Sequence, residues 1–588
     1  MNRIVFCVVL CLSVMAIAGQ LQAKKPVESK PKAAVCAVEH EAACRWLAEH
    51  TADSIVQRMK LTAVTHTDEW VLFGDANDHG FVLVAKQAFW PYIHHPVLAY
   101  STEHTFAIDR PTQTILLYYA RRLDAIASLG ISPASQDEGI YVAPMLGQTA
   151  WGQTEPYNGA CAMKDGKRAL TGCMAVAVGQ IMRYHAHPDN IAWAAMQDSY
   201  MPDDRTVQPV AQLLAGLGIA LQAQYGKQLT STTLEYFKPV MTLNYGYSPR
   251  LTVHYMAEPG TIEGGIRAEL QAGRPVLATN MQHAFVVDGC DGAYLHLNMG
   301  WEGHCNGWYD PLNVAELRDA RASERLIASI VTGFMPSGDE RHKEVEVQHA
   351  GELKELLSED DILTVTHLTV RGKLGSEDVA LLRRMAGYAD AGKLQLPVGS
   401  LTHLDLSEVH WINDRVPFLR ERMTGVTTIQ TTYVEYEVNE MAGKNETARS
   451  VTKHGVDLSK PVSDKDWEKF EEVTGITDGM SFHRDAQGYV WTYYTTFAKT
   501  ISPMMFRECT SLRELILPAD TRSIGHGAFV RCECLERIDI PAKVTHIGKQ
   551  AFSFCTSLEE FRYHKKSIAI ESPNFEATPR KLQYKFSK

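Results

Sequence analysis

One cysteine has the surroundings of a reactive thiol. Cys173 follows Thr171 and Gly172 in the stretch TGCMAVAVGQIMRYHAHP, residues 171–188. The apolar residues after it recur at helical spacing, which predicts a helix that begins at the cysteine. A helix N-terminus offers unpaired N–H groups and a favourable dipole, and both stabilise a thiolate. The same window also fits a buried cysteine that only packs in a core, so this stretch alone leaves both interpretations open.

A nucleophilic cysteine also needs a base, and the base needs a partner that orients it. In QHAFVVDGCDGAYLHLNMGWEGHCNGWYDP, residues 282–311, His283 opens a predicted strand and Asn298 ends the next one. The turn DGCDG between the two strands predicts antiparallel pairing, which brings His283 near Asn298. A cysteine on a helix, a histidine on a remote strand and an asparagine on the paired strand are typical of papain-like enzymes.

The chain is long enough for three or four domains of about 150 residues each. Its 588 residues are 45% hydrophobic and 22% charged, as in a soluble globular protein. The formal net charge is -11 and no dense Lys/Arg block interrupts the sequence, which argues against a nucleic-acid partner. We expect five segments: a signal peptide over 1–23, a small α+β unit over 24–140, an α+β unit over 141–336, a charged linker over 337–345, and a repeat domain over 346–588.

The first segment, MNRIVFCVVLCLSVMAIAGQLQA, has a short basic start, an apolar stretch and small residues before a cleavage point. This pattern predicts a secretory signal peptide, and therefore a secreted or cell-surface protein. No later segment is long and apolar enough to span a membrane, so we do not expect an integral membrane protein. Two of the twelve cysteines lie in this segment, and the remaining ten are too sparse for a disulfide scaffold.

The last domain contains an internal repeat with a period of 23 residues. Its copies begin at Ile501, Ile524 and Ile547, and they align three phenylalanines, three cysteines and three leucines. Such units cannot bury their apolar faces alone, so neighbouring copies must stack into a solenoid. We expect the aligned residues Cys509, Cys532 and Cys555 to form a buried ladder and not a metal site. The repeats resemble BspA-like leucine-rich repeats.

The central unit resembles the streptopain family of papain-like cysteine proteases. The resemblance rests on GQTEPYN, on TGCMAVAVGQIMRYHAHP, and on HAFVVDG with LNMGW and NGWY, and it covers roughly residues 141–336. The stretch GFVLVAKQAFWPYIHHPVLAYSTEHTF before it is similar to the inhibitory propeptide of the family. The implied fold class is α+β: a papain-like catalytic domain, preceded by a small α+β propeptide and followed by a leucine-rich-repeat solenoid.

The resemblance implies a role for each motif residue. Cys173 is the expected nucleophile, and His283 is its general base and then its acid. The amide of Gln153 and the backbone N–H of Cys173 are expected to stabilise the oxyanion. Asn298 is expected to orient the imidazole, and Trp301 to shield that contact from water.

Three positions depart from the family pattern. Met299 replaces the first tryptophan of Asn-Trp-Gly-Trp-Gly, Glu302 replaces its last glycine, and Gln282 replaces the glycine before the histidine. Met299 is still apolar, so it is expected to preserve the shielding. Gln282 adds a bulky polar side chain beside the expected substrate cleft. We therefore place Gln282 and Met299 among the residues that affect substrate binding and rate.

The acidic, histidine and cysteine residues between 288 and 305 do not follow a zinc-binding spacing, so we expect no metal there and no cofactor. Cys290 and Cys305 are candidates for a disulfide that the sequence alone does not decide.

The resemblance implies a secreted cysteine endopeptidase made as a zymogen, with its own propeptide as inhibitor and proteins or peptides as substrates. The repeats would bind a host or cell-surface protein, or the substrate itself. Two other functions remain open at this point. One is a non-catalytic adhesin that keeps the protease fold, an alternative that the three departures from the family pattern support. The other is a papain-like acyl transferase such as a transglutaminase.

Overall fold

The computed structural model describes residues 36–586 except short stretches at 78, 109–111, 131–138, 256–258, 281, 313–324, 390–396, 424–425, 440–442, 465, 468–477, 565–567 and 580–581. The predicted signal peptide lies outside the described residues. The chain forms two compact units: Met1–Thr232 with His254–Thr332, and Thr233–Val253 with Gly333–Lys588. No helix among the described residues has the length and apolar character needed to cross a bilayer.

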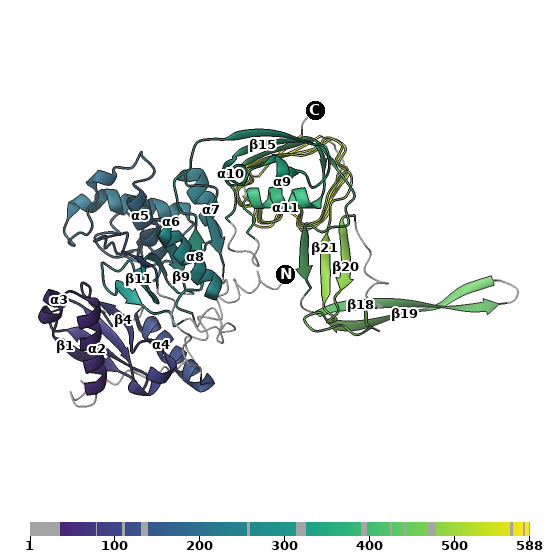
Figure 1. Cartoon of the computed structure of the whole chain (residues 1–588). Coiled ribbons are helices and arrows are strands. Elements are labelled where there is room, and N and C mark those ends of the chain that lie inside the picture. The colour runs from purple at the N-terminus through teal and green to yellow at the C-terminus, as the bar shows by residue number, and fades with distance from the viewer. Residues whose placement is uncertain are drawn as a thin grey trace. The chain divides into compact units, whose positions relative to one another are not determined.

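One antiparallel sheet runs through the first unit and joins the two sequence segments that we distinguished there (Figure 1). Its strands, in spatial order, are β1 (Leu61–His66), β2 (Trp70–Asp75), β3 (Phe81–Ala85), β4 (Val97–Ser101), β12 (Gly307–Tyr309), β11 (Tyr294–Asn298), β10 (Ala284–Asp291), β9 (Val276–Thr279), β13 (Ser329–Thr332) and β8 (Thr252–His254), with β5 (Tyr141–Val142) beside β10. The junction is the β4–β12 pair, in which Trp308 lies opposite Tyr100 and Tyr309 opposite Ala99. The N-terminal α+β segment therefore extends the sheet of the segment that contains Cys173.

Helices cover both faces of this sheet. They are α2 (Ala37–His50), α3 (Asp53–Arg58), α4 (Thr112–Leu129), α5 (Cys173–His185), α6 (Gln208–Ala220) and α8 (Pro259–Gln271). Alternate residues of a strand point to opposite faces. Phe285 and Val287 of β10 pack with Ile266 of α8, whereas Val286 lies on the other face, where its pairing partner Asn298 contacts α5. Short elements complete the unit: η2 (Gln87–Tyr92), η3 (Trp193–Ala195), η4 (Arg205–Val207), and the hairpin of β6 (Met163–Lys164) and β7 (Lys167–Arg168).

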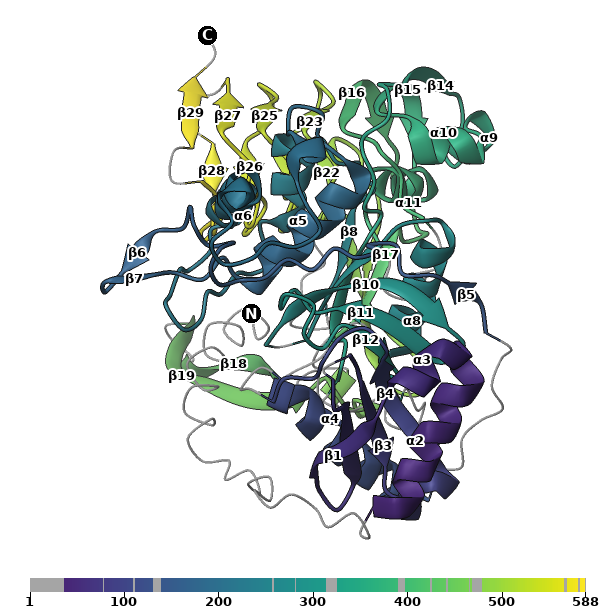
Figure 2. The same ribbon diagram turned by 90° about the vertical axis from the view of Figure 1, so that its left-hand side faces the viewer.

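Two sheets of stacked parallel strands form the centre of the second unit, and Figure 2 shows the strands of the longer sheet in a row. The longer sheet has the order β14 (His342–Val347), β15 (His367–Leu374), β16 (His403–Trp411), β23 (Glu514–Ile516), β25 (Arg537–Ile540), β27 (Glu560–Tyr563) and β29 (Gln583–Phe586). The shorter one has β22 (Thr500–Ile501), β24 (Ser523–Ile524), β26 (His546–Ile547) and β28 (Ala569–Ile570). Consecutive strands lie side by side in parallel, which confirms the predicted solenoid.

The repeat core is a ladder of aligned aromatic rings and thiols. The rings of Phe506 and Phe529 stack at 5.8 Å, and those of Phe529 and Phe552 at 5.1 Å. The three aligned cysteines are buried, as predicted. Cys532 donates to the Phe506 carbonyl at 3.0 Å, and burial raises the pKa of Cys509 to about 12. These thiols are structural.

The remaining elements of the second unit precede or interrupt the repeats. They are α7 (Phe237–Pro239), the π-helical turn η5 (Val240–Asn244), α9 (Leu353–Leu356), α10 (Glu359–Thr364), α11 (Ser376–Met385), β17 (Leu419–Arg422), β21 (Val490–Tyr494), β20 (Met480–Arg484), and the hairpin of β18 (Val426–Asn439) and β19 (Gly443–Asp457). The short strand β8 (Thr252–His254) lies where the chain passes between the two units. Thr233–Val253 falls inside the range predicted for the protease domain but is grouped with the repeats.

Phe529→Ala tests the aromatic ladder. The substitution removes the central ring of a fully buried stack, and such cavities cost about 3–5 kcal/mol. We therefore expect a loss of that size in the unfolding free energy of the second unit, measured by calorimetry on the full chain. Ile516→Ala, at an exposed position of β23, is the matched control and should change little. Equal effects of the two substitutions would contradict the ladder.

Candidate active site

Cys173 is the first residue of helix α5, as its sequence pattern predicts. Gly172 precedes it with a φ of 91°, a conformation that glycine adopts readily, and a side chain there would approach Thr230 to 3.0 Å. The thiol is half-buried. Burial raises the pKa of Cys173, while the backbone N–H groups of Ala284, Met174 and Cys173 itself act in the opposite direction. The thiol thus lies at the helix N-terminus and against the first residue of β10.

His283 immediately precedes that residue. Its backbone is held by Asn280, whose side-chain oxygen accepts from the N–H of Gln282 at 2.8 Å and of His283 at 2.7 Å. Asn280 was not singled out from the sequence, although Asn is a residue that often bonds to the backbone two or three positions on. Because Ala284 lies beside Cys173 and is bonded to His283, the structure brings the predicted nucleophile and base to one place.

Contacts with the Met299 carbonyl and the Trp301 ring help to fix the orientation of the His283 imidazole. Its Nε2 lies 2.8 Å from the carbonyl oxygen of Met299, and its ring stacks on Trp301 with centroids 4.4 Å apart. A carbonyl can only accept, so Nε2 carries the proton in this contact and the lone pair of the neutral ring is on Nδ1. Nδ1 is therefore the atom that can act as a base.

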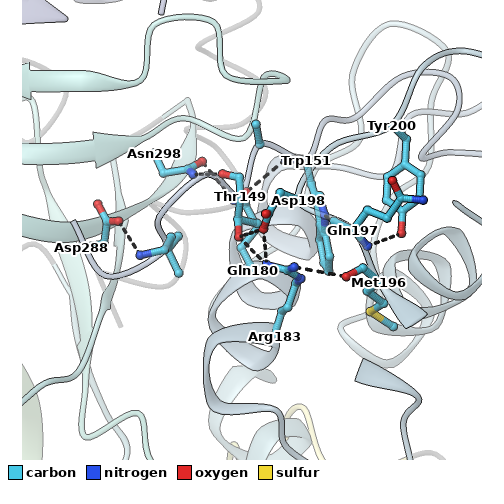
Figure 3. Close-up of polar contacts among 12 residues, drawn as sticks. Thr149, Trp151, Gln180, Arg183, Met196, Gln197, Asp198, Tyr200, Asp288 and Asn298 are labelled. Carbon is cyan, nitrogen blue, oxygen red and sulfur yellow. Dashed lines mark hydrogen bonds and ion pairs between the residues drawn. The ribbon is translucent and has the colours of Figure 1, made fainter. Parts of the chain in front are cut away.

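Asn298 ties helix α5 to the segment before it and does so through its whole side chain (Figure 3). Its Oδ1 accepts from Gln180 Nε2 at 3.1 Å and from Gly300 N–H at 3.1 Å, and its Nδ2 donates to the Thr149 carbonyl at 2.7 Å. Gln180 also accepts from Trp151 N–H at 3.2 Å. The Met299 carbonyl, next in sequence to Asn298, accepts from the imidazole, and Asn298 fixes the segment that carries this carbonyl.

Gln153 lies on the same segment and is half-buried. Its carbonyl accepts from Thr171 N–H at 3.2 Å, two residues before Cys173. This contact holds the Gln153 backbone beside the start of α5. The oxyanion role of its amide stays a prediction.

The three departures from the family pattern have different environments. Met299 is 1% exposed and packs in the core, so its side chain does not line a surface. Gln282 is exposed. Glu302 is exposed too and accepts from Thr154 Oγ1 at 2.8 Å, while its N–H donates to the Trp151 carbonyl at 3.2 Å. The Glu302 side chain thus lies over the segment that contains Gln153.

The other titratable residues nearby have structural roles. His296 Nδ1 lies 2.6 Å from Asp288 Oδ1, and the other oxygen of Asp288 accepts from Leu146 N–H at 2.9 Å. Cys290 and Cys305 are both buried thiols.

The comparisons with known proteins agree with this arrangement. Residues 151–192 and 189–309 match the Peptidase C10 family, and residues 494–587 match the BspA type leucine rich repeat region in six copies. Streptopain of Streptococcus pyogenes is 29% identical over 195 residues, 26% of this chain and 48% of that protein. The thiol protease/hemagglutinin PrtT of Porphyromonas gingivalis is 25% identical over 292 residues, 40% of this chain and 33% of that protein.

Two solved structures also align with the chain. A prointerpain A fragment of Prevotella intermedia aligns with a TM-score of 0.42 at 21% identity, over 48% of this chain and 100% of that one. Active interpain A aligns with a TM-score of 0.30 at 22% identity, over 34% and 100%. The chain spans about half the length of the streptopain it matches. The matches to the Peptidase C10 family, to streptopain and to the BspA type repeat region confirm the two resemblances, and the mixed helices and strands of the structure confirm the α+β fold class.

Asn298→Ala tests the buried amide network. The substitution removes a hydrogen-bond partner of three buried groups, the Gln180 amide, the Gly300 N–H and the Thr149 carbonyl. We expect it to lower the free energy of unfolding by about 2–3 kcal/mol. We expect the first unit to unfold at a correspondingly lower urea concentration. Asn190→Ala, at an exposed position, is the control. An Asn298→Ala protein as stable as the control would show that the network is not needed for the fold.

Proposed function

We propose that this chain is a secreted cysteine endopeptidase made as a zymogen, with Cys173 as nucleophile and His283 as base. The observation that carries the proposal is the placement of Cys173 at the N-terminus of α5, against Ala284, the first residue of β10. The predicted base, His283, is the residue that precedes Ala284. The match of residues 151–309 to the Peptidase C10 family supports the same chemistry.

In the proposed reaction, Nδ1 of His283 takes the thiol proton and the Cys173 sulfur attacks the scissile carbonyl carbon. The side-chain amide of Gln153 and the backbone N–H of Cys173 donate to the oxyanion. The imidazolium then gives its proton to the leaving amine, which departs and leaves a thioester. His283 next activates water, which hydrolyses the thioester and restores the thiol. The Met299 carbonyl and the Trp301 ring hold the imidazole throughout.

Contacts between the N-terminal α+β segment and the rest of the first unit support its proposed role as an inhibitory propeptide. Besides the β4–β12 pair, the Thr105 carbonyl accepts from Cys305 N–H at 2.8 Å, and Thr105 Oγ1 lies 3.0 Å from His304 Nδ1. Both contacts lie on the loop just after Trp301, which stacks on the base. In this form burial raises the pKa of Cys173, which disfavours the reactive thiolate. We infer that removal of the segment frees this loop and activates the enzyme.

The repeats are proposed to bind a cell-surface protein or the protein substrate, and so to raise the local substrate concentration. Their removal is a poor test, because Thr233–Val253 packs with them. Lys238 is fully buried there and donates to Thr510 Oγ1 at 2.8 Å and Ser511 Oγ at 3.0 Å. A truncated chain would expose this lysine and its apolar neighbours.

Casein hydrolysis under reducing conditions tests the activity. We expect an epoxide thiol inhibitor and Cys173→Ala to abolish it, because both remove the nucleophile, and Cys44→Ala, which alters an exposed cysteine, to leave it intact. Absence of thiol-dependent hydrolysis in processed wild-type protein would favour the adhesin. Isopeptide product without peptide cleavage would favour the acyl transferase.

Maturation tests the zymogen. The polar connector SPASQDEG, residues 132–139, is the predicted cleavage region and lies almost wholly outside the described residues. We expect wild-type protein to be cut between about 132 and 143 by its own activity, and Cys173→Ala protein expressed alone to stay uncut, as judged by N-terminal sequencing. Normal maturation of the Cys173→Ala protein would show that cleavage is not autocatalytic.

A further inference from the structure

Three histidines stand side by side at one end of the parallel sheet of the second unit. His342, His367 and His403 are the first residues of β14, β15 and β16, which lie next to one another in Figure 2. The strand register places His342 opposite His367, and His367 opposite His403. Their rings stack with centroids 4.2 Å and 4.1 Å apart and with interplanar angles of 17° and 6°. The pairing of strands thus builds a histidine ladder from residues far apart in sequence.

The threonine before each of two histidines holds one ring nitrogen. Thr366 Oγ1 lies 3.0 Å from His367 Nδ1, and Thr402 Oγ1 lies 2.9 Å from His403 Nδ1. The single hydroxyl proton of each threonine is directed to a backbone carbonyl, that of Arg341 or of Thr366. Each hydroxyl therefore accepts from Nδ1–H, which leaves the lone pair on Nε2, the tautomer of a metal-binding histidine with a fixed outer partner.

Neutral imidazole nitrogen is a preferred ligand of zinc.

A carboxylate completes a set of three ligand atoms. Glu340 Oε2 lies 3.7 Å from His342 Nε2, and the ligand atoms of Glu340, His342 and His367 all lie within 4.8 Å of one another. Two ligands on one tetrahedral zinc ion, each bonded at about 2.0–2.1 Å, are about 3.4 Å apart. Glu340 and His342 are exposed, so both side chains can rotate to bring the three atoms to that separation, the His342 ring by turning out of its stack on His367.

His403 lies outside this set because it stacks on the far side of His367. The carboxylate of Glu514, 3.9 Å from His403 Nε2, also forms an ion pair with Arg537. Its part is to fix the plane of the His367 ring.

We propose that Glu340, His342 and His367 form a binding site for Zn²⁺, with water in the fourth position. The ion would link the edge strand β14 to β15 and so stabilise the start of the solenoid. This site is independent of the proposed protease activity.

The experiment uses the full chain with Cys173→Ala, because a thiol beside a histidine also binds zinc. Zn²⁺ alone is titrated against a fluorescent chelator at neutral pH, and thermal unfolding is recorded with and without the ion. We expect His342→Gln and His367→Gln each to lose one bound Zn²⁺ or to weaken it about tenfold or more, and to lose the zinc-dependent rise in melting temperature. Sites elsewhere in the chain are present in every variant, so the difference isolates this one.

The matched control is His410→Gln, at an exposed position of β16 away from the ladder, which should bind as the parent does. Unchanged binding in both His342→Gln and His367→Gln, with the variants folded by circular dichroism, would overturn the site. Loss of the ion in His403→Gln but not in His342→Gln would overturn this ligand assignment.

Discussion

The contact between the start of helix α5 and the start of strand β10 is the interaction on which the proposed chemistry depends. The N–H of Ala284 donates a hydrogen bond to the Cys173 sulfur, and His283 precedes Ala284 in the chain. Helix α5 is buried from Met174 to Met182, so it cannot shift along the sheet without disturbing a packed core. The Gln180–Asn298 hydrogen bond then fixes the helix against β11, which leads to the Met299 carbonyl and Trp301.

Side-chain patterns predicted the helix at Cys173 and the antiparallel pair that follows His283, because helical spacing and a glycine-rich turn are local signals. The 23-residue period predicted the buried ladder of Cys509, Cys532 and Cys555, because equivalent positions of stacked repeats lie next to one another. The partner of the imidazole was not predictable, since a backbone carbonyl has no residue-type signal. The partners of Asn298 come from Thr149 and Gln180, and only the folded chain brings them together.

Other features depend on backbone pairing between distant segments. The β4–β12 pair joins the N-terminal segment to the sheet through main-chain groups. The sequence of each strand therefore does not indicate which strand it pairs with. The histidine ladder arises in the same way. His342, His367 and His403 are unequally spaced in the sequence, so no repeat pattern indicates them, and only the parallel register of β14, β15 and β16 brings them together. Thr233–Val253 belongs to the second unit, but no change in composition marks where this segment begins or ends, so the sequence did not predict it.

The pH dependence of Cys173 alkylation by iodoacetamide, followed by mass spectrometry, tests the central claim most directly. In the uncleaved chain, burial raises the pKa of Cys173 above its ordinary 9.0, so reaction should begin only at alkaline pH. In the matured chain we expect rapid alkylation already below about pH 7, as for thiolates beside a histidine, and we expect His283→Gln to abolish it. Identical pH profiles with and without His283 in the matured chain would contradict the assignment of these two residues as a catalytic pair.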